Sequence, residues 1–270
     1  MSDSMTVFDR RAVRQRRDRR AAEFAHYDFL VREAAERLLD RLADVTRTFP
    51  VALDLGCHTG QLADLLQGRG GIETLVQCDL SPAMTAIAAG NGHPSVTADE
   101  EWLPFADGSF DLVLSCLSLH WVNDLPGALV QIRRVLKPEG LFLGVMLGNE
   151  TLQNLRLAFA AAEQDIEGGV SPRVSPFADV RDVGQLLQRA GFVLPVADSD
   201  CIEVRYAEPW KVLDDLRGMG ESNAATLRHK QPLRRLTLMT VLQTLANDYA
   251  GDDGRIPMAF DLVGMTGWAS

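Results

Sequence analysis

The sequence predicts an α/β protein built on a mostly parallel sheet with helices on both faces. Two observations support this. The segment 51–55 is apolar on both faces, as expected for a strand covered by helices on each side. Strand-like runs then alternate with helix-like runs, separated by turns rich in glycine. A chain of 270 residues, 46% hydrophobic and 24% charged, can bury one such core with insertions.

The first confident helix is expected at residues 29–45. Its apolar residues recur every three or four positions and form one stripe: Phe29, Leu30, Ala34, Leu38, Leu42 and Val45. This helix is expected to pack against the sheet and to carry no site.

A glycine-containing turn follows the first strand, 51–55, and precedes an expected helix at 61–66. Gly56 and Gly60 carry no Cβ, so the backbone between them can approach a bound ligand closely. Asp54 lies just before this turn. The pattern is typical of a nucleoside-cofactor loop, with a simple strand-to-helix turn as the alternative.

The second strand is expected at 72–79, and it ends in Asp79. Ser81 and Pro82 are suited to cap and begin the next helix. Because Asp79 lies at the tip of the second strand, 23 residues past Gly56, it is placed to accept hydrogen bonds from ribose hydroxyls. Dinucleotide and mononucleoside cofactors both fit this spacing.

Later units repeat the pattern. A fourth strand is expected at 110–115, a helix at 124–136, a stop at 137–140 and a fifth strand at 141–147. Ordered motifs accompany these elements: Asp54-x-Gly56-x-x-x-Gly60, Asp79, Asp99 with Leu103-Pro104-Phe105, Phe110-Asp111 and Leu136-Lys137-Pro138-Glu139-Gly140.

Over roughly residues 30–206, this set resembles the class I S-adenosylmethionine-dependent methyltransferases. The resemblance implies a Rossmann-like, seven-stranded, mostly parallel sheet in the order 3-2-1-4-5-7-6, with S-adenosylmethionine as cofactor. It also implies the roles of particular residues. Asp54 and the glycine turn would hold the amino-acid part, Asp79 the ribose, and Asp99 with Glu100 the adenine edge.

The complete candidate set for the cofactor is Asp54, Gly56, Cys57, His58, Gly60, Asp79, Leu80, Asp99, Glu100 and Ser115. Residues 115–118 would line the floor beneath the sulfonium. His58 stands where most class I enzymes have glycine, so its ring either narrows the pocket or points to solvent.

Four further segments resemble the methyltransferase-like assembly factors of mitochondrial respiratory complex I. They are Val7-Phe8-Asp9-Arg10, residues 118–125, residues 167–172 and residues 216–223. That family implies hydroxylation of an arginine on an iron–sulfur subunit, rather than methylation. The core is also similar to the malonyl-carrier-protein methyltransferases of biotin synthesis. The fold therefore leaves the reaction open.

His120 and Trp121 are the candidates nearest the chemistry. A histidine just after the fourth strand suits proton transfer near neutral pH, and Trp121 can stack on a guanidinium. The alternative is that both simply cap the strand and pack. Glu221 and Asn223, in a glycine-flanked loop, are candidate substrate residues for a cationic side chain; the alternative there is a plain helix–helix connection.

Three regions are expected: a basic arm at 1–28, a core at 29–206 with a lid insertion at 148–176, and a helical extension at 207–270 packed on the core. The last two core strands are expected as an antiparallel hairpin of 192–197 and 202–206. Residues 1–20 hold seven arginines and three aspartates, so their net charge is +4 and the remainder carries −14. The arm is either solvated or a clamp that closes over the cofactor or docks on an acidic partner.

Composition narrows the function classes. The net charge of −10 argues against a general nucleic-acid binder, and no apolar run reaches the roughly 18 residues of a membrane span. The polar start predicts a cytoplasmic location. The four cysteines and five histidines show no metal-ligand spacing, so no metal is expected. Two classes remain: an enzyme that modifies a protein, carrier or small-molecule substrate, and a noncatalytic assembly module that retains the fold. The oligomeric state is left open.

Overall fold

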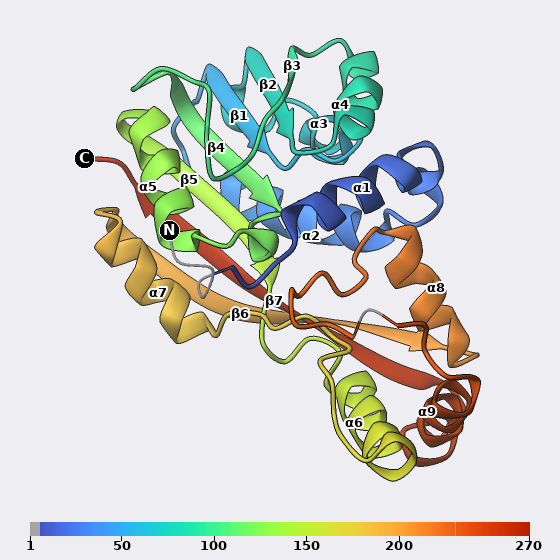
Figure 1. The fold of residues 1–270 in the computed structure, drawn as a ribbon. Coiled ribbons are helices and arrows are strands. Elements are labelled where there is room, and N and C mark those ends of the chain that lie inside the picture. The colour runs from blue at the N-terminus through green and yellow to red at the C-terminus, as the bar shows by residue number, and fades with distance from the viewer. Residues whose placement is uncertain (1–5, 230) are drawn as a thin grey trace.

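The computed structural model describes residues 6–229 and 231–270, arranged around one seven-stranded sheet (Figure 1). The strand order is β3-β2-β1-β4-β5-β7-β6, which confirms the expected order. Strands β3, β2, β1, β4 and β5 are parallel, whereas β7 runs antiparallel to both β5 and β6. The strands are β1 (Val51–Leu55), β2 (Thr74–Asp79), β3 (Ser95–Thr97), β4 (Phe110–Cys116), β5 (Leu136–Leu147), β6 (Val193–Tyr206) and β7 (Ile256–Trp268).

Helices occupy most of the connections between the strands. The α-helices are α1 (Arg10–Arg20), α2 (Phe29–Ala43), α3 (Gln61–Leu66), α4 (Pro82–Ala88), α5 (Leu125–Val135), α6 (Gln153–Glu167), α7 (Val180–Arg189), α8 (Trp210–Gly218) and α9 (Arg235–Asp248). Short 3-10 turns are η2 (Ala21–His26), η3 (Arg69–Gly71), η4 (Ala89–Asn91) and η5 (Leu119–Trp121).

Both faces of the sheet are buried, which explains the uninterrupted apolar runs. Side chains of β1 alternate between two cores: Ala52 joins the core beneath α2, and Leu53 joins the core beneath α5 and α7. The helix expected at 29–45 is α2, which ends at Ala43. Leu30, Ala34, Leu38 and Leu42 of the expected stripe are buried, whereas Phe29 is 37% exposed and Val45 lies beyond the helix. Among the described residues, no helix is long and apolar enough to cross a membrane.

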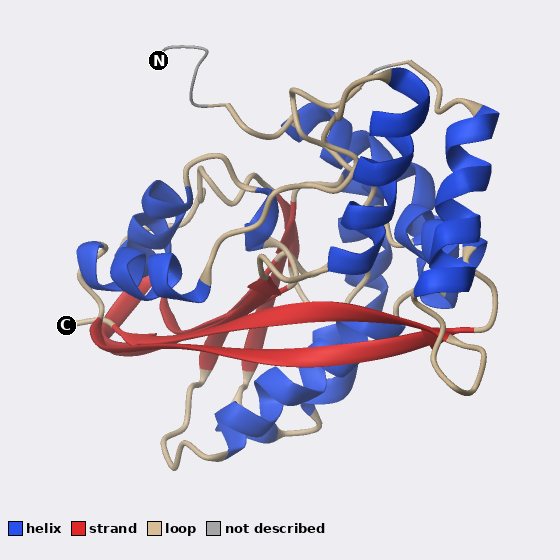
Figure 2. Ribbon diagram, turned by 90° about the horizontal axis from the view of Figure 1, so that it is seen from below, coloured by secondary structure: helices blue, strands red, loops and turns tan. Residues whose placement is uncertain are grey.

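Two expectations about the C-terminal region are wrong. The segment expected as a hairpin, 192–206, is a single 14-residue strand, β6. Its antiparallel partner β7 comes from the region expected to be helical and lies between β5 and β6. The core therefore runs to residue 268, and only α8 and α9 belong to the helical extension. In Figure 2, β6 and β7 are the pair of long strands that lie side by side and extend beyond the other strands.

The polar middle of β6, which suggested a turn, has a different explanation. β6 lies at one edge of the sheet, so its acidic side chains face solvent and partner charges. Asp198 pairs with Arg41 at 2.5 Å, and Asp200 pairs with Arg37 at 2.5 Å, both from α2. These ion pairs fasten α2 to the edge of the sheet.

The basic arm is ordered where it is described. Residues 1–5 of the expected arm lie outside the described residues. Residues 10–20 form α1, and the Asp9 carboxylate caps it by accepting from the Ala12 amide at 3.0 Å. Phe8, Val13 and Trp121 form a small apolar cluster that holds α1 down. For residues 6–28, the alternative of a solvated arm is therefore wrong, and the alternative of a clamp stays a prediction.

Candidate cofactor and substrate site

The turn after β1 requires glycine at two positions. Gly56 has φ +80°, and a Cβ there would lie 2.1 Å from the Cβ of Ser118. Gly60, the N-cap of α3, has φ +98°, and its Cβ would meet the Asn91 amide at 2.2 Å. The amides of Gly56 and Cys57 both donate to the carbonyl of Cys78, which fixes the turn against β2. The turn thus has the close backbone approach that its sequence predicts.

Asp54 is a buried acidic residue behind this turn. Its side chain is fully buried, and neither carboxylate oxygen has a hydrogen-bond partner among the described residues. Burial, assisted by the charge of Asp79, raises the pKa of Asp54 to about 8. An ammonium group would satisfy both oxygens. Asp54 therefore fits the amino-acid part of S-adenosylmethionine.

His58 points into the protein. Its φ is +50°, and its ring stacks on Phe24 with a centroid separation of 5.5 Å and an interplanar angle of 10°. Nε2 lies 3.0 Å from the carbonyl oxygen of Cys116. Burial and the nearby charge of Arg17 lower the pKa of His58, so the ring is neutral near pH 7 and Nε2 donates to that carbonyl. The alternative that His58 points to solvent is wrong.

Asp79 is already engaged by α1. Its Oδ2 accepts from the Arg17 guanidinium at 3.1 Å and from the His58 amide at 3.2 Å. Arg17 is only 1% exposed, and it also reaches the Ser118 hydroxyl at 3.4 Å. Burial would lower the pKa of Arg17, but Asp79 and Glu100 outweigh it and raise the pKa, so the guanidinium stays charged.

The acids expected at the adenine edge are paired with the same helix. Arg10 contacts the carboxylates of Asp99, at 2.7 Å, and Glu100. Glu100 is fully buried, which favours its neutral form, but Arg10, Arg17 and a hydrogen bond from Ser118 lower its pKa overall. Arg10 and Arg17 are seven residues apart and so share one face of α1. That face closes over the expected nucleoside site.

The remaining cofactor candidates have structural partners. The Ser115 hydroxyl donates to the Leu55 carbonyl at 2.8 Å and joins β4 to β1. Leu80 packs against the small cluster under α1, and the buried Cys57 thiol lies beside the His58 carbonyl. The glycine turn and Asp54 fit the cofactor as they stand. Asp79 fits its ribose once Arg17 leaves that carboxylate.

The structure brings together three residues singled out for chemistry. Glu221 Oε2 lies 2.9 Å from His120 Nε2, and the Trp121 indole donates to both Glu221 oxygens at 3.1 Å. Burial raises the pKa of Glu221, but His120, Arg17 and Trp121 outweigh burial and lower it, so the carboxylate is ionised. His120 Nδ1 has no partner among the described residues. Trp121 also packs edge-to-face on Phe8, with centroids 5.4 Å apart, so the packing alternative holds for part of its surface.

A mostly apolar cavity of about 180 Å³, the inner cavity, reaches Glu221. Its walls include Leu152, Phe159 and Phe177. Phe159 also lines a larger groove of about 800 Å³ on the outside, so the inner cavity adjoins the surface there.

Asn223 lies in the loop after α8 and joins it to the insertion at 148–176, which the sequence predicts as a lid. Its amide donates to the Pro172 carbonyl at 2.6 Å and accepts from the Ser175 hydroxyl at 3.1 Å and the Ala225 amide at 2.9 Å. The residue lines the inner cavity, but its side chain is engaged with protein. Direct substrate recognition by Asn223 stays a prediction.

Sequence reasoning placed Ser118 in the floor at 115–118 and allowed the basic arm to close over the cofactor, but it did not single out Arg10 and Arg17 as the arginines that pair with the acids of the site. A signal was present, because Arg10, Val13 and Arg17 have helical spacing and so place two cations and an anchor on one face. Within the described ranges, no three His, Cys, Asp or Glu side chains are grouped as metal ligands would be.

Comparisons with known proteins show which proteins the chain is similar to. A family described as "Methyltransferase domain" matches residues 53–144. The chain is 43% identical to arginine-hydroxylase NDUFAF5 of Danio rerio, covering 98% of this chain and 83% of that protein. It is 42% identical to the Homo sapiens protein of the same name, covering 98% of this chain and 77% of that one. A malonyl-[acyl-carrier protein] O-methyltransferase of Halorhodospira halophila is 38% identical, covering 96% and 88%.

Solved structures share the fold. The YcgJ protein from Bacillus subtilis has a TM-score of 0.61 at 14% identity, covering 88% of this chain and 98% of that one. The [4+2]-cyclase SpnF has a TM-score of 0.52 at 19% identity, covering 88% and 82%. The family implies S-adenosylmethionine as cofactor. On its sequence identity and coverage, the chain belongs to the family of methyltransferase-fold proteins that includes the arginine-hydroxylases NDUFAF5 and the malonyl-[acyl-carrier protein] O-methyltransferases.

Proposed function

We propose that the protein binds S-adenosylmethionine and modifies an arginine side chain of a protein substrate, with a subunit of respiratory complex I as the candidate partner. The observation that carries the proposal is Glu221, an ionised carboxylate whose side chain is only 10% exposed and which lines a mostly apolar cavity. Relatives more than 40% identical are named arginine-hydroxylases, which supports the same substrate class.

An arginine side chain matches the inner cavity in its two parts. Its three methylene groups suit the leucine and phenylalanine walls, and its guanidinium suits a carboxylate such as Glu221. The chain itself shows that this region tolerates a buried guanidinium, because Arg17 is enclosed by Asp79, Glu100 and Ser118. Trp121, which donates to Glu221, adds an aromatic ring beside that carboxylate.

The residues have separate tasks. When bound, S-adenosylmethionine supplies an electrophilic methyl group. Asp54 and the backbone at Gly56 hold its amino-acid part, and Glu221 orients the substrate guanidinium. His120 Nε2 lies 2.9 Å from Glu221 Oε2 and holds that carboxylate in place. A proton must leave a guanidinium nitrogen that acts as a nucleophile, and the contact between Glu221 and His120 offers a route for it.

Mass spectrometry separates the reactions that this fold permits. A candidate iron–sulfur subunit is incubated with the protein and S-adenosylmethionine, and its intact mass and arginine-containing peptides are measured. Methylation adds 14 mass units and hydroxylation adds 16. Either increase on an arginine supports the proposal, and an increase on any other residue type contradicts it. Glu221→Gln should lower the rate roughly 10- to 100-fold, equal to about 1.4–2.8 kcal/mol. The exposed Glu150→Gln serves as the matched control.

A second candidate function is carboxyl methylation of a carrier protein or small molecule, favoured by the 38% identity to the Halorhodospira halophila enzyme. It predicts methylation of a malonyl-carrier protein that is independent of Glu221. A noncatalytic assembly module predicts no mass change and no cofactor binding in calorimetry. The expected cytoplasmic location stays a prediction, and the NDUFAF5 relatives are named mitochondrial.

A further inference from the structure

Two surface hollows meet where α1, the lid and the C-terminal loop converge. The first is the outer groove of about 800 Å³, which runs along α6 and residues 170–176. The second, the cationic pocket, has a volume of about 460 Å³. The cationic pocket is lined by Arg16, Pro172, Arg173, Asn223, Arg228 and His229. Pro172 and Arg173 line both hollows, so the two are contiguous.

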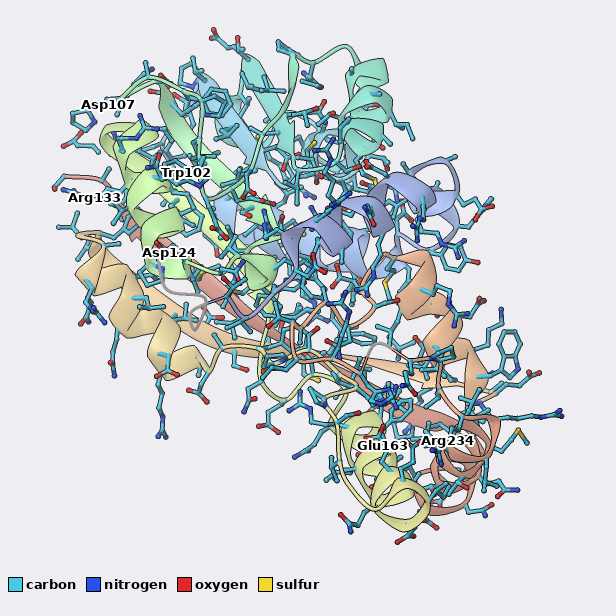
Figure 3. The ribbon with its side chains drawn as sticks, viewed as in Figure 1. Trp102, Asp107, Asp124, Arg133, Glu163 and Arg234 are labelled. Atoms are coloured by element: carbon cyan, nitrogen blue, oxygen red, sulfur yellow. The ribbon has the colours of Figure 1, made fainter. Side chains whose placement is uncertain are left out.

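The cationic pocket carries more positive charge than its own acids neutralise. Arg173 pairs with Glu163 of α6, labelled in Figure 3, and Arg228 pairs with Asp9 at 3.0 Å. Arg16 makes no salt bridge among the described residues, and its hydrogen bond goes to the Ser222 carbonyl. Burial and the neighbouring charge of Arg228 outweigh the opposing charges of Asp9 and Glu221 and lower the pKa of Arg16.

The guanidiniums are held in position before any partner arrives. Arg228 donates to the carbonyl of Ala225 at 2.9 Å as well as to Asp9. The Arg173 side chain is only 13% exposed and is fixed by the buried Glu163. Fixed guanidiniums lose little conformational entropy on binding a carboxylate, which strengthens recognition of that group.

The outer groove exposes an unusual amount of apolar surface. Val7, Leu157, Val170 and Leu227 are 44%, 52%, 60% and 85% exposed, and all four line it. Contiguous exposed apolar side chains beside a charged rim are typical of sites that bind another protein. The groove also adjoins the inner cavity through Phe159, Arg173 and Val174.

We propose that this face docks an acidic segment of a protein partner. An aspartate or glutamate carboxylate of the segment enters the cationic pocket, and an apolar side chain beside it fills the outer groove. The complementary charge favours an acidic partner, although the chain as a whole carries −10. This docking goes beyond the proposed function, because it requires no particular reaction at Glu221.

Fluorescence anisotropy of a labelled peptide tests the docking directly. The probe is a dodecapeptide of four Leu-Glu-Glu repeats, and the control peptide has four Leu-Gln-Gln repeats. We expect the full-length protein to bind the acidic probe at least tenfold more tightly than the glutamine peptide. Combining Arg16→Gln with Arg228→Gln should weaken probe binding at least tenfold, and Leu227→Ser should weaken it several-fold.

A matched pair of variants controls for charge alone. Arg47→Gln and Arg205→Gln, combined, remove two charges from side chains that are each 50% exposed and line neither hollow. This pair should leave probe binding unchanged, and circular dichroism checks that each protein is folded. Equal weakening by both pairs, or no binding of the acidic probe, overturns the proposal. So does binding of anionic lipid vesicles or single-stranded DNA that depends on Arg16 and Arg228 while probe binding does not.

Discussion

At the scale of single residues, Arg17 of α1 pairs with Asp79 inside the candidate cofactor site. Arg17 Nη1 lies 3.1 Å from the carboxylate expected to hold the ribose. A ribose and a guanidinium cannot both use Asp79 Oδ2 in full, because the His58 amide already donates to that oxygen. Arg17 therefore occupies the position on Asp79 that a ribose hydroxyl would use.

Replacing Arg17 should strengthen cofactor binding. Arg17→Gln removes the competitor for Asp79, so we expect S-adenosylhomocysteine to bind three- to tenfold more tightly in calorimetry. Arg14→Gln, on the same helix and 52% exposed at its side chain, is the matched control and should change nothing. Weaker binding by Arg17→Gln would show instead that Arg17 is a cofactor ligand.

Asp54 should make stability depend on pH. Its folded pKa of about 8 exceeds its ordinary value of 3.8. The stabilisation is therefore fully present below pH 3.8 and is lost as pH rises through 8, with a slope of up to about 1.4 kcal/mol per pH unit. Denaturant unfolding at pH 5 and pH 8 should show Asp54→Asn gaining stability relative to the unmodified protein as pH rises. Parallel changes in the two proteins would contradict the assignment.

The same residues show how far sequence reasoning reaches. Asp54, Gly56 and Asp79 follow strands of one parallel sheet, so their positions follow from local pattern and topology. The partners of Asp79 and His120 do not, because Arg17 lies 62 residues before Asp79 and Glu221 lies 101 residues after His120. Which long-range side chains meet depends on packing that no local pattern specifies.

At the scale of elements, β7 is the strand that the sequence patterns do not predict. Its burial alternates at first, as in a strand with one covered face, and it follows helix α9 with no strand beside it in sequence. The sequence predicts two strands in place of β6 because the polar residues at its middle are typical of a turn. An edge strand tolerates such residues, so β6 continues through them. Local composition does not predict β7 or the full length of β6, because these two strands pair with each other and are far apart in the sequence.

Removing β7 should prevent folding. The strand pairs with β5 on one side and β6 on the other, and it buries Phe260, Leu262 and Met265. Each buried side chain contributes about 1.5–3 kcal/mol, and typical domains are stable by only about 5–15 kcal/mol in total. We expect a chain ending at residue 249 to aggregate or to lack a cooperative thermal transition in circular dichroism.

Deletion of Ser270 alone is the control for that truncation, because the residue is exposed and lies beyond β7. The shortened chain should unfold like the full chain. Cooperative, soluble folding of the chain that ends at residue 249 would show that β7 is dispensable, against its central place in the sheet.

At the scale of the whole molecule, three separate segments meet at the carboxyl ends of the parallel strands. α1 covers Asp79 and Glu100, the loop after α8 brings Glu221 to His120, and the lid is fastened to that loop through Asn223. Cofactor site, substrate cavity and proposed docking face are consequently neighbours. A movement of α1 that frees Asp79 would also move Arg16 in the cationic pocket.

A crystal structure of the protein with S-adenosylhomocysteine tests the central claim most directly. We predict a nucleoside over Gly56 with its ribose hydroxyls on Asp79, its ammonium group near Asp54, and the Arg17 guanidinium displaced from the Asp79 carboxylate. A nucleoside bound elsewhere, or bound here while Arg17 still occupies Asp79 Oδ2, would contradict the account.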